Sequence, residues 1–422
     1  MSTSFDDVRR HVAAGDISGA VRALRPLAGT AGLQDLAAEV RPLAEAVGFD
    51  GLAKAAREAA RKPGDAQRLY DFGHLCIEHG IAFAAVPALR EALRLAPGSA
   101  RQILSELVAA LEAEDRNAEA TQELLRHEAL LESWPGQYLV AYNALLSGDL
   151  ATARDRAARL PAPQDEVWTW AHQRLRGMLD RAEAAVRTAP LDDADLRGWQ
   201  FALTGTLLGT LSPYGFHVMR GRYAYLGDSY EACRRGLDRL ATALDAAGRS
   251  PRAVSALPGR SDRILALAAA EILGLDLVPY APDRPDTLVV AYDLSAHDED
   301  VQAPLRERAT GQVLYEHAST WTEPGTVPAD FSCLQRQVGS EPWGGQLGVD
   351  GRGEADTRPE EAIARDIVTA DAGTADPGDG SAPAGSDTDT AFRAFAAAVA
   401  PFWLTGPRTA IRSAGPVRSN HF

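Results

Sequence analysis

Cysteine, lysine, methionine and long apolar runs are all scarce in this 422-residue sequence. Its three cysteines, Cys76, Cys233 and Cys333, are odd in number and far apart, which fits neither a disulfide framework nor a paired-cysteine metal motif. No apolar run approaches the roughly 20 residues that a membrane helix needs. The first residues, MSTSFDDVRR, lack the basic start and apolar core of a secretory signal. We therefore expect a protein of the reducing cytoplasm with no membrane partner.

Acidic groups outnumber basic ones, and the formal net charge is −15. Binding to nucleic acid relies on neutralising phosphates with lysine and arginine, so this charge argues against a nucleic-acid partner. Lys54 and Lys62 are the only lysines, and arginine supplies nearly all the positive charge. This bias, together with abundant alanine, is typical of a bacterial genome rich in G and C. The hydrophobic fraction of 45% fits a globular chain with room for two or three domains.

The first half of the chain repeats a short pattern about every 33 residues. A glycine, or in one copy an aspartate, is followed at offsets of 5, 9 and 12 mostly by small or apolar residues. These offsets place the side chains on one helical face, and alanine lets a neighbouring helix approach closely. The glycine ends one helix and lets the chain reverse, so each copy is predicted to be a helix–turn–helix. The six copies start at Gly15, Gly48, Gly80, Asp115, Gly148 and Gly177.

The copy at residues 66–99 matches a known repeat pattern best. It carries Leu69, Gly73, Ala85, Leu89, Ala92 and Pro97, although the usual first aromatic residue is missing. Residues 5–190 thus resemble the tetratricopeptide repeat (TPR) family, with the other copies departing further from its pattern. The resemblance implies a TPR-like α-solenoid domain at 1–195 whose groove binds a peptide or protein. The family's contacting residues vary, so none is carried over.

The second half changes to the pattern of a small α/β domain, predicted at 196–348. Asp228 and Glu231 form a capping-box pattern that starts a helix running to about Ala247. Apolar, strand-like runs follow as RAVSALP, LDLVPY, DTLVVAYDLS and QVLYEHAS, and the helix LPGRSDRILALAAAEILGLDL lies between the first two. A strand–helix–strand order of this kind predicts a short parallel sheet. The whole chain is therefore expected to be mainly α, a solenoid followed by this α/β domain.

Two loops are candidates for a ligand site, because ligands of such sheets bind beyond the carboxyl ends of the strands. The first would hold a phosphate-containing ligand with the backbone N–H groups of a helix start and nearby side chains. The second reads DLSAHDED, where Asp293, His297 and the acids at 298–300 offer metal or acid–base groups. The candidate ligand-binding residues are Gly259, Arg260, Ser261, Asp262, Arg263 and Asp293.

A simpler interpretation of these loops is structural, and we favour it. Ser261 or Asp262 is what a helix prefers at its N-cap, and a single His297 does not make a metal site. No metal or cofactor is expected. The segment 214–225, where arginines alternate with aromatics, fits a packed junction better than a base-binding surface. Trp321, Trp343 and Trp403 fit either a pocket lining or, more commonly, a core.

The end of the chain combines an acidic segment with an apolar helix. Residues 350–390 hold 11 acids and 3 arginines, and their composition predicts a disordered linker at 349–388. At 389–422 the run TAFRAFAAAVAPFWLTG predicts a helix that docks on the α/β domain or on a partner. A basic tail, predicted to be extended, follows this helix. We expect the tail to bind an acidic surface, such as that of the solenoid.

Two functions remain open at this point. The first is a scaffold or adaptor that binds a peptide or protein partner in the solenoid groove. The alternative is a nucleotide- or phosphosugar-binding enzyme or regulator, with its site at the carboxyl edge of the sheet. The sequence assigns no catalytic residue to either.

Overall fold

The computed structural model describes residues 4–96, 98, 100–211, 222–322, 325–345, 347–348, 351–372, 387–406, 408, 410–411, 413 and 415–417. The chain forms two compact units, Met1–Trp168 and Thr169–Phe422, so the division falls before the predicted boundary at 195. Most of the segment 214–225 lies outside the described residues, as does the 373–386 part of the expected linker. Within the described ranges, no helix is both long and apolar enough to cross a membrane.

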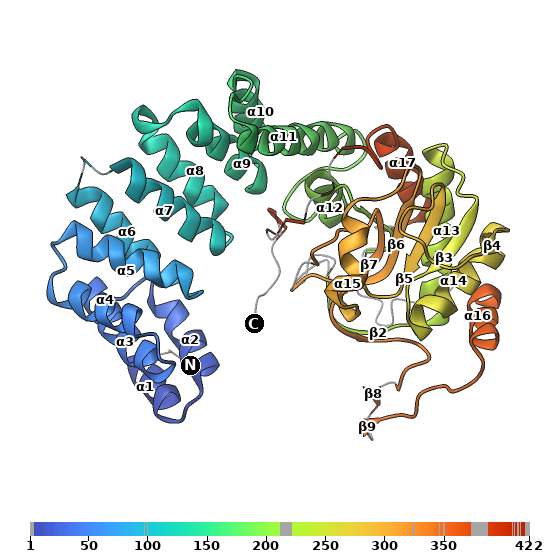
Figure 1. Ribbon diagram of the computed structural model, residues 1–422, viewed down its shortest axis with the longest axis horizontal. Helices are drawn as coiled ribbons and strands as arrows, with labels where there is room; N and C mark the ends of the chain where they lie inside the picture. Colours follow the sequence, from blue (N-terminus) through green and yellow to red (C-terminus); the bar gives the residue numbers. More distant parts are fainter. Residues whose placement is uncertain are drawn as a thin grey trace. The chain divides into compact units, whose positions relative to one another are not determined.

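The first unit is a series of five helical hairpins, each packed on the next (Figure 1). Short 3₁₀ or π turns connect some of them, at Arg25–Leu27, Glu128–Leu130 and Ser133–Gln137. The helical, repeating character predicted for this half is therefore present. The hairpins are α1 (Phe5–Ala13) with α2 (Ile17–Leu24), α3 (Leu33–Ala46) with α4 (Asp50–Arg61), α5 (Ala66–Glu78) with α6 (Ala82–Leu95), α7 (Ala100–Ala113) with α8 (Asn117–Arg126), and α9 (Tyr138–Leu146) with α10 (Leu150–Arg159).

All five hairpins turn in the same way. The residue at each turn has a positive φ: 73° at Gly15, 77° at Gly48, 74° at Gly80, 52° at Asp115 and 87° at Gly148. The residue after the turn residue donates its N–H to the carbonyl of the residue five positions before it. In the third hairpin, for example, Ile81 donates to Cys76, and the N···O distances of all five bonds are 2.8–2.9 Å. This left-handed turn with its long hydrogen bond is a common helix C-terminus and favours glycine. The glycine spacing therefore located these five turns correctly.

The alanines five residues after the turns pack as predicted. Each is almost fully buried, at 0–3% exposure, because a small side chain lets the second helix of a hairpin lie close to its neighbours. These residues are Ala20, Ala53, Ala85, Ala120 and Ala153.

The sixth predicted turn, at Gly177, is wrong. Gly177 lies inside α11 (Glu166–Ala185), which is one continuous helix of 20 residues. The flanking residues, QRLRGMLDRAEAA, are mostly strong helix formers. Together they offset the cost of about 1 kcal/mol that one internal glycine adds.

The second unit contains a parallel sheet, as predicted, and seven strands of it lie in the described residues. Their order is β4–β3–β5–β6–β7, with β1 and β2 both pairing with β7 at the far edge. The predicted runs correspond to β3, β4, β5 and β6, whereas β1, β2 and β7 were not anticipated. The strands are β1 (Leu207–Leu208), β2 (Tyr223–Gly227), β3 (Ala253–Ala256), β4 (Asp276–Leu277), β5 (Thr287–Ala291), β6 (Val313–Thr320) and β7 (Phe331–Ser340).

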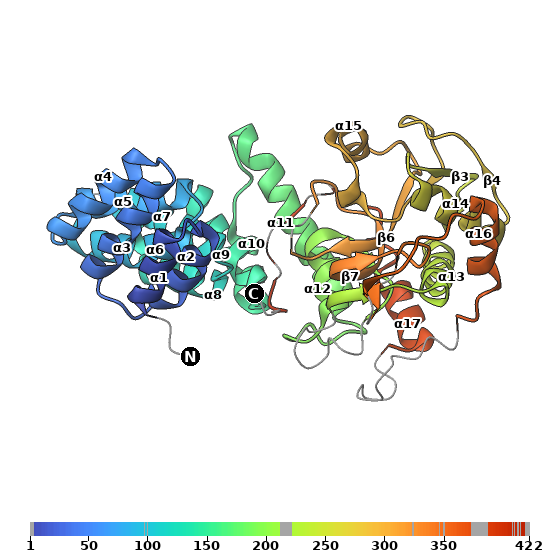
Figure 2. The ribbon, with the colours of Figure 1, turned by 90° about the horizontal axis from the view of Figure 1, so that it is seen from below.

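Helices cover the sheet on both faces. On one face, α13 (Tyr230–Ala246) and α14 (Arg260–Leu273) lie beside α16 (Glu360–Thr369) and α17 (Asp389–Val399) (Figure 1, Figure 2). The short α15 (Glu299–Gln302) lies on the other side, and α12 (Leu196–Thr204) packs along β1. A small antiparallel pair, β8 (Leu347–Gly348) and β9 (Gly351–Arg352), precedes α16.

Part of the segment predicted to be disordered is the helix α16. Its Ile363, Ala364 and Ile367 are buried, and the helix packs on α14. Ala364 and Ile367 follow Ile363 by one and four positions, so the three side chains form a narrow apolar stripe on one face of the helix. The acidic composition of the whole segment does not reveal this stripe. The disorder predicted for 349–388 therefore does not apply to residues 360–369.

The C-terminal helix docks on the α/β unit, one of the two outcomes expected from the sequence. Phe392 of α17 contacts Phe331 of β7 at a ring distance of 6.2 Å, and Phe395 contacts Phe201 of α12 at 6.1 Å. The following Trp403 is buried and donates its indole N–H to the carbonyl of Asp330 at 2.8 Å.

The described residues of the tail also contact this unit. The carbonyl of Val417 accepts a hydrogen bond of 2.6 Å from Arg222, and Arg408 pairs with Asp330. Binding of the tail to the solenoid remains a prediction.

Candidate functional site

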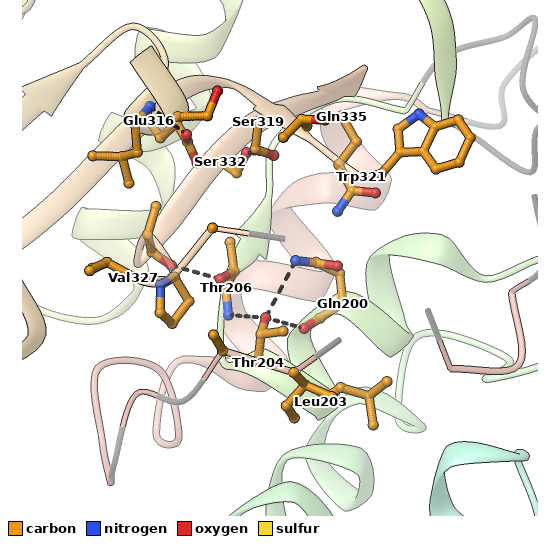
Figure 3. Close-up of a pocket in the computed structure, with 18 of the residues that line it drawn as sticks. Gln200, Leu203, Thr204, Thr206, Glu316, Ser319, Trp321, Val327, Ser332 and Gln335 are labelled. Carbon is orange, nitrogen blue, oxygen red and sulfur yellow. Dashed lines mark hydrogen bonds between the residues drawn. The ribbon is translucent and has the colours of Figure 1, made fainter. Parts of the chain in front are cut away.

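A pocket of about 110 Å³ lies on the α12 side of β6 and β7 (Figure 3). Its floor consists of polar side chains of the two strands, and apolar parts of α12 and the segment 325–329 face them. The loop after β5 contributes Leu294 and Ser295, and the C-terminal segment contributes Ile411 and Ser413. Segments far apart in the sequence thus meet around one small cavity.

Glu316 of β6 is the main ionisable group of the pocket floor. It is only 6% exposed, and its Oε1 accepts a hydrogen bond of 2.8 Å from the Leu294 N–H. Burial, reinforced by the negative charge of Asp293, raises the pKa of Glu316 to about 8. The carboxyl group therefore keeps its proton at neutral pH and can donate a hydrogen bond.

The other polar groups of the floor come from paired positions of two strands. Glu316 lies opposite Ser332 and Ser319 lies opposite Gln335 in the parallel register. The Ser319 and Ser332 hydroxyls are 2.8 Å apart. Gln335 is 6% exposed, and no described residue hydrogen-bonds to its Oε1. A buried acceptor without a partner is costly, so this oxygen is suited to receiving a donor from a ligand.

Aromatic side chains complete the pocket. Trp199 of α12 and Trp321 after β6 both line it. Of the three tryptophans that the sequence offered as a pocket lining, Trp321 therefore has this role. The other two are core residues: Trp343 and Trp403 are 3% and 2% exposed, respectively.

The two predicted loops meet next to this pocket, at the point where the strand order reverses. After β3 the chain continues to β4 on one side of the sheet, and after β5 it continues to β6 on the other side. Ligands of open α/β sheets usually bind at such a reversal, beyond the carboxyl ends of the two strands. Asp262, at 3% exposure, accepts the Tyr292 N–H at 2.7 Å and pairs with His297 at 3.1 Å. The hydrogen bond to Asp262 raises the pKa of His297.

The predicted helix cap differs in detail. The N-cap residue of α14 is Gly259, without a side-chain cap, so neither Ser261 nor Asp262 has that role. Asp262 lies within the first turn, where a negative charge is favoured by the helix dipole, and it is held by the loop after β5 instead.

The remaining predicted ligand residues make contacts within the protein. Arg260 donates to the carbonyls of Asp356 and Arg358 at 2.8 and 2.9 Å, and Arg263 pairs with Glu360 at 2.6 Å. Ser261 accepts the indole N–H of Trp343 at 2.9 Å. These contacts fasten the segment before α16 to α14. Phosphate binding by this loop remains a prediction.

Asp293, also predicted to bind ligand, is paired. Its Oδ1 accepts from the N–H and hydroxyl of Ser295 at 2.9 and 2.6 Å, and its Oδ2 pairs with Arg336 of β7. Asp293 therefore lies between the predicted loops and the pocket. Its negative charge helps to raise the pKa of His297 in the loop and of Glu316 in the pocket.

A second polar cluster is completely buried on the α13 face of the sheet. The sequence suggested that Asp228 caps α13, but the N-cap residue is Ser229. Asp228 instead pairs with His317 of β6 at 2.7 Å. Burial alone would raise the pKa of Asp228, but the attraction to His317 outweighs burial and lowers it. Cys233 lies 3.5 Å from both partners, and burial with the nearby Asp228 raises the pKa of its thiol to about 12.

Sequence reasoning missed most residues of the pocket and of this cluster. One signal was available: the strand QVLYEHAS carries Glu316 and His317 side by side within an apolar run. Ionisable residues in a strand that is buried on both faces need partners, so they mark polar sites within the fold.

No family model, curated protein sequence or solved structure matches this chain.

Proposed function

We propose that the α/β unit binds a small, uncharged polar ligand in the pocket beside Glu316. The observation that carries the proposal is the unpaired Oε1 of Gln335, which is buried and directed into a cavity. A protonated Glu316 offers a donor, and the serine hydroxyls offer both donors and acceptors. Few, well-placed polar groups beside aromatic rings are typical of small-molecule sites.

The size of the pocket limits the ligand to about one ring. A cavity of roughly 150 Å³ holds a benzene-sized molecule, and this one is of similar size. The hydroxyl and amide lining beside Trp199 and Trp321 fits a sugar ring or a nucleobase. A nucleotide or phosphosugar, the alternative from the sequence, would place this ring in the pocket and its phosphate outside.

Calorimetric titration of the full chain tests the proposal with a panel of monosaccharides, nucleosides and their phosphate esters. At least one neutral member should bind, and Gln335→Leu should weaken binding about tenfold because it removes the unpaired Oε1 at similar side-chain volume. Gln67→Leu, at an exposed position of α5, is the matched control and should bind normally. Equal binding by wild type and Gln335→Leu, or no binding by the whole panel, would rule out this site.

A second function rests on the helical hairpins. Their common turn and packing support the resemblance to tetratricopeptide repeats, and hence a scaffold role in the cytoplasm with a protein or peptide partner. A groove of about 320 Å³ between α4 and α5 offers a contact surface of mixed charge. Lys54, Glu58, Arg68, Asp71 and His74 line it.

The two lysines of the chain give this scaffold function a direct test. Lys54 lines the groove, whereas the exposed Lys62 does not, so an amine-reactive crosslinker samples one groove position and one control position. Crosslinking in cells should attach a partner that is lost with Lys54→Arg and kept with Lys62→Arg. If the adducts are the same in both variants, the partner does not bind in this groove.

A further inference from the structure

Three potential metal ligands meet in the buried cluster on the α13 face. They are Asp228, which follows β2, Cys233 in the first turn of α13 and His317 of β6. The thiol sulfur is 3.5 Å from both the Asp228 Oδ2 and the His317 Nε2, and these two atoms are 2.7 Å apart. The donors form a compact triangle drawn from three separate segments of the chain.

The triangle has nearly the size of one face of a zinc tetrahedron. Bond lengths of about 2.0–2.3 Å from zinc to nitrogen, oxygen and sulfur place neighbouring ligands about 3.4–3.6 Å apart. Both distances to sulfur already meet this requirement. Only the Asp228–His317 distance must open, by about 0.7 Å, as an ion replaces their hydrogen bond.

The neighbouring contacts of Asp228 and His317 fix the orientation of the ligating atoms. The other oxygen of Asp228, Oδ1, accepts the Ser229 N–H at 2.8 Å. The other ring nitrogen of His317, Nδ1, lies 3.2 Å from the Tyr315 hydroxyl. A second contact of this kind on each ligand is the usual support of protein metal sites. The Tyr292 hydroxyl donates a hydrogen bond of 3.0 Å to Asp228 Oδ2 and helps to hold this oxygen in the cluster.

Burial makes the charge balance decisive. The side chains of Asp228 and His317 are 0% exposed, and Cys233 is 0% exposed. A doubly charged cation with one carboxylate, one thiolate and one neutral imidazole has no net charge, which is what an interior site requires. Sulfur and nitrogen together with one carboxylate favour zinc over magnesium or calcium.

From this geometry we propose that Asp228, Cys233 and His317 bind one zinc ion that fastens α13 to the sheet. On binding, the ion replaces the thiol proton of Cys233 and the proton shared by His317 and Asp228. Both protons pass to solvent, and the net charge of the cluster does not change. The sequence predicted no metal, because these ligands are spread over residues 228–317 without a local motif.

Metal analysis of the purified full-length protein tests the proposal. After expression with added zinc and extensive dialysis, mass spectrometry should find about one zinc per chain. Cys233→Ala should reduce the content to about a tenth or less. The matched control is Cys76→Ala, which removes an equally buried cysteine from the first unit and should keep the zinc.

Cobalt gives a second readout, which reports a metal–thiolate bond directly in the wild-type protein. Metal-free wild-type protein titrated with Co²⁺ should develop the near-ultraviolet absorption of a cobalt–thiolate bond, as should Cys76→Ala, whereas Cys233→Ala should not. Wild-type protein that retains no zinc and gives no such absorption would show that the cluster is only a hydrogen-bonded pair. Equal metal binding by Cys233→Ala would place the metal elsewhere.

Discussion

The two units of the molecule are stabilised in different ways. In the first unit, a turn of three residues joins the two helices of each hairpin, and the hairpin packs on its sequence neighbours through small alanines. In the second unit, buried charged groups join distant segments, as when Arg197 and Arg239 both pair with Asp387. Repetition of a local pattern builds the first unit, whereas a few specific long-range contacts build the second.

This difference determines where single substitutions should be most damaging. Breaking a buried ion pair leaves a charge without a partner, whereas changing one repeated turn affects only one hairpin. The following predictions test this contrast, beginning with the largest effect.

Asp330→Ala should be the most destabilising of these changes. Asp330 is 3% exposed; its Oδ2 lies 3.1 Å from the Nε of the buried Arg308 and accepts the Leu314 N–H at 2.8 Å. Arg408 pairs with its other oxygen. Removing the carboxylate leaves the buried Arg308 without its charged partner. The free energy of unfolding, measured by urea denaturation, should therefore fall by about 3–5 kcal/mol. Asp283→Ala, at an exposed loop position, should change it little, and similar losses in both would refute the contrast.

Glu316→Gln should alter the pH dependence of stability. The folded-state pKa of Glu316, about 8, is above its unfolded value of 4.5, so folding favours the protonated form. The stability of the wild type should therefore fall as pH rises from about 5 to 8, by up to about 1.4 kcal/mol per pH unit from this residue. The variant lacks this contribution and should gain relative to wild type at higher pH. Thermal unfolding across that range measures the difference, and parallel curves would contradict a neutral Glu316.

Gly73→Ala should destabilise one hairpin of the first unit. A methyl group at Gly73 in α5 would lie 2.6 Å from the Leu89 Cγ of α6, so the two helices would have to move apart. We expect a loss of about 1–3 kcal/mol in the free energy of unfolding. Gly51→Ala in α4 meets no atom within 4 Å and should be neutral or slightly stabilising. If both changes have the same effect, close packing of the hairpins is not the reason for glycine at position 73.

Gly80→Ala should have the smallest effect. Its φ of 74° is unfavourable for alanine, which should cost about 1 kcal/mol in thermal unfolding. Gly64→Ala is the control, since Gly64 has open space around its Cα and is not among the residues with positive φ. A loss at Gly64 as large as that at Gly80 would remove backbone conformation as the cause.

The same contrast explains how much of the structure the sequence could predict. Five hairpin turns were located from spacing alone, because a left-handed turn residue and a small side chain five positions later are local requirements. The strand–helix–strand around α14 was recognisable for a similar reason. By contrast, β7 reads FSCLQRQVGS without a clean alternation, and its role depends on pairing with β6, β1 and β2.

The candidate site was only partly predictable for the same reason. The loops after β3 and β5 do meet, through Asp262 and His297, because strand ends of a parallel sheet share an edge. The pocket depends on Gln335 and on the C-terminal segment, whose positions are set by contacts over more than a hundred residues. Asp228 looked like a helix cap because its partner, His317, lies far along the chain.

The participation of Ile411 and Ser413 in the pocket wall has a consequence for biosynthesis. The opposite wall, α12, leaves the ribosome about two hundred residues earlier. Until Ile411 and Ser413 are synthesised, the α12 side chains that line the pocket lack these neighbours. The pocket can therefore be completed only after residue 413 has been synthesised, about two hundred residues after α12.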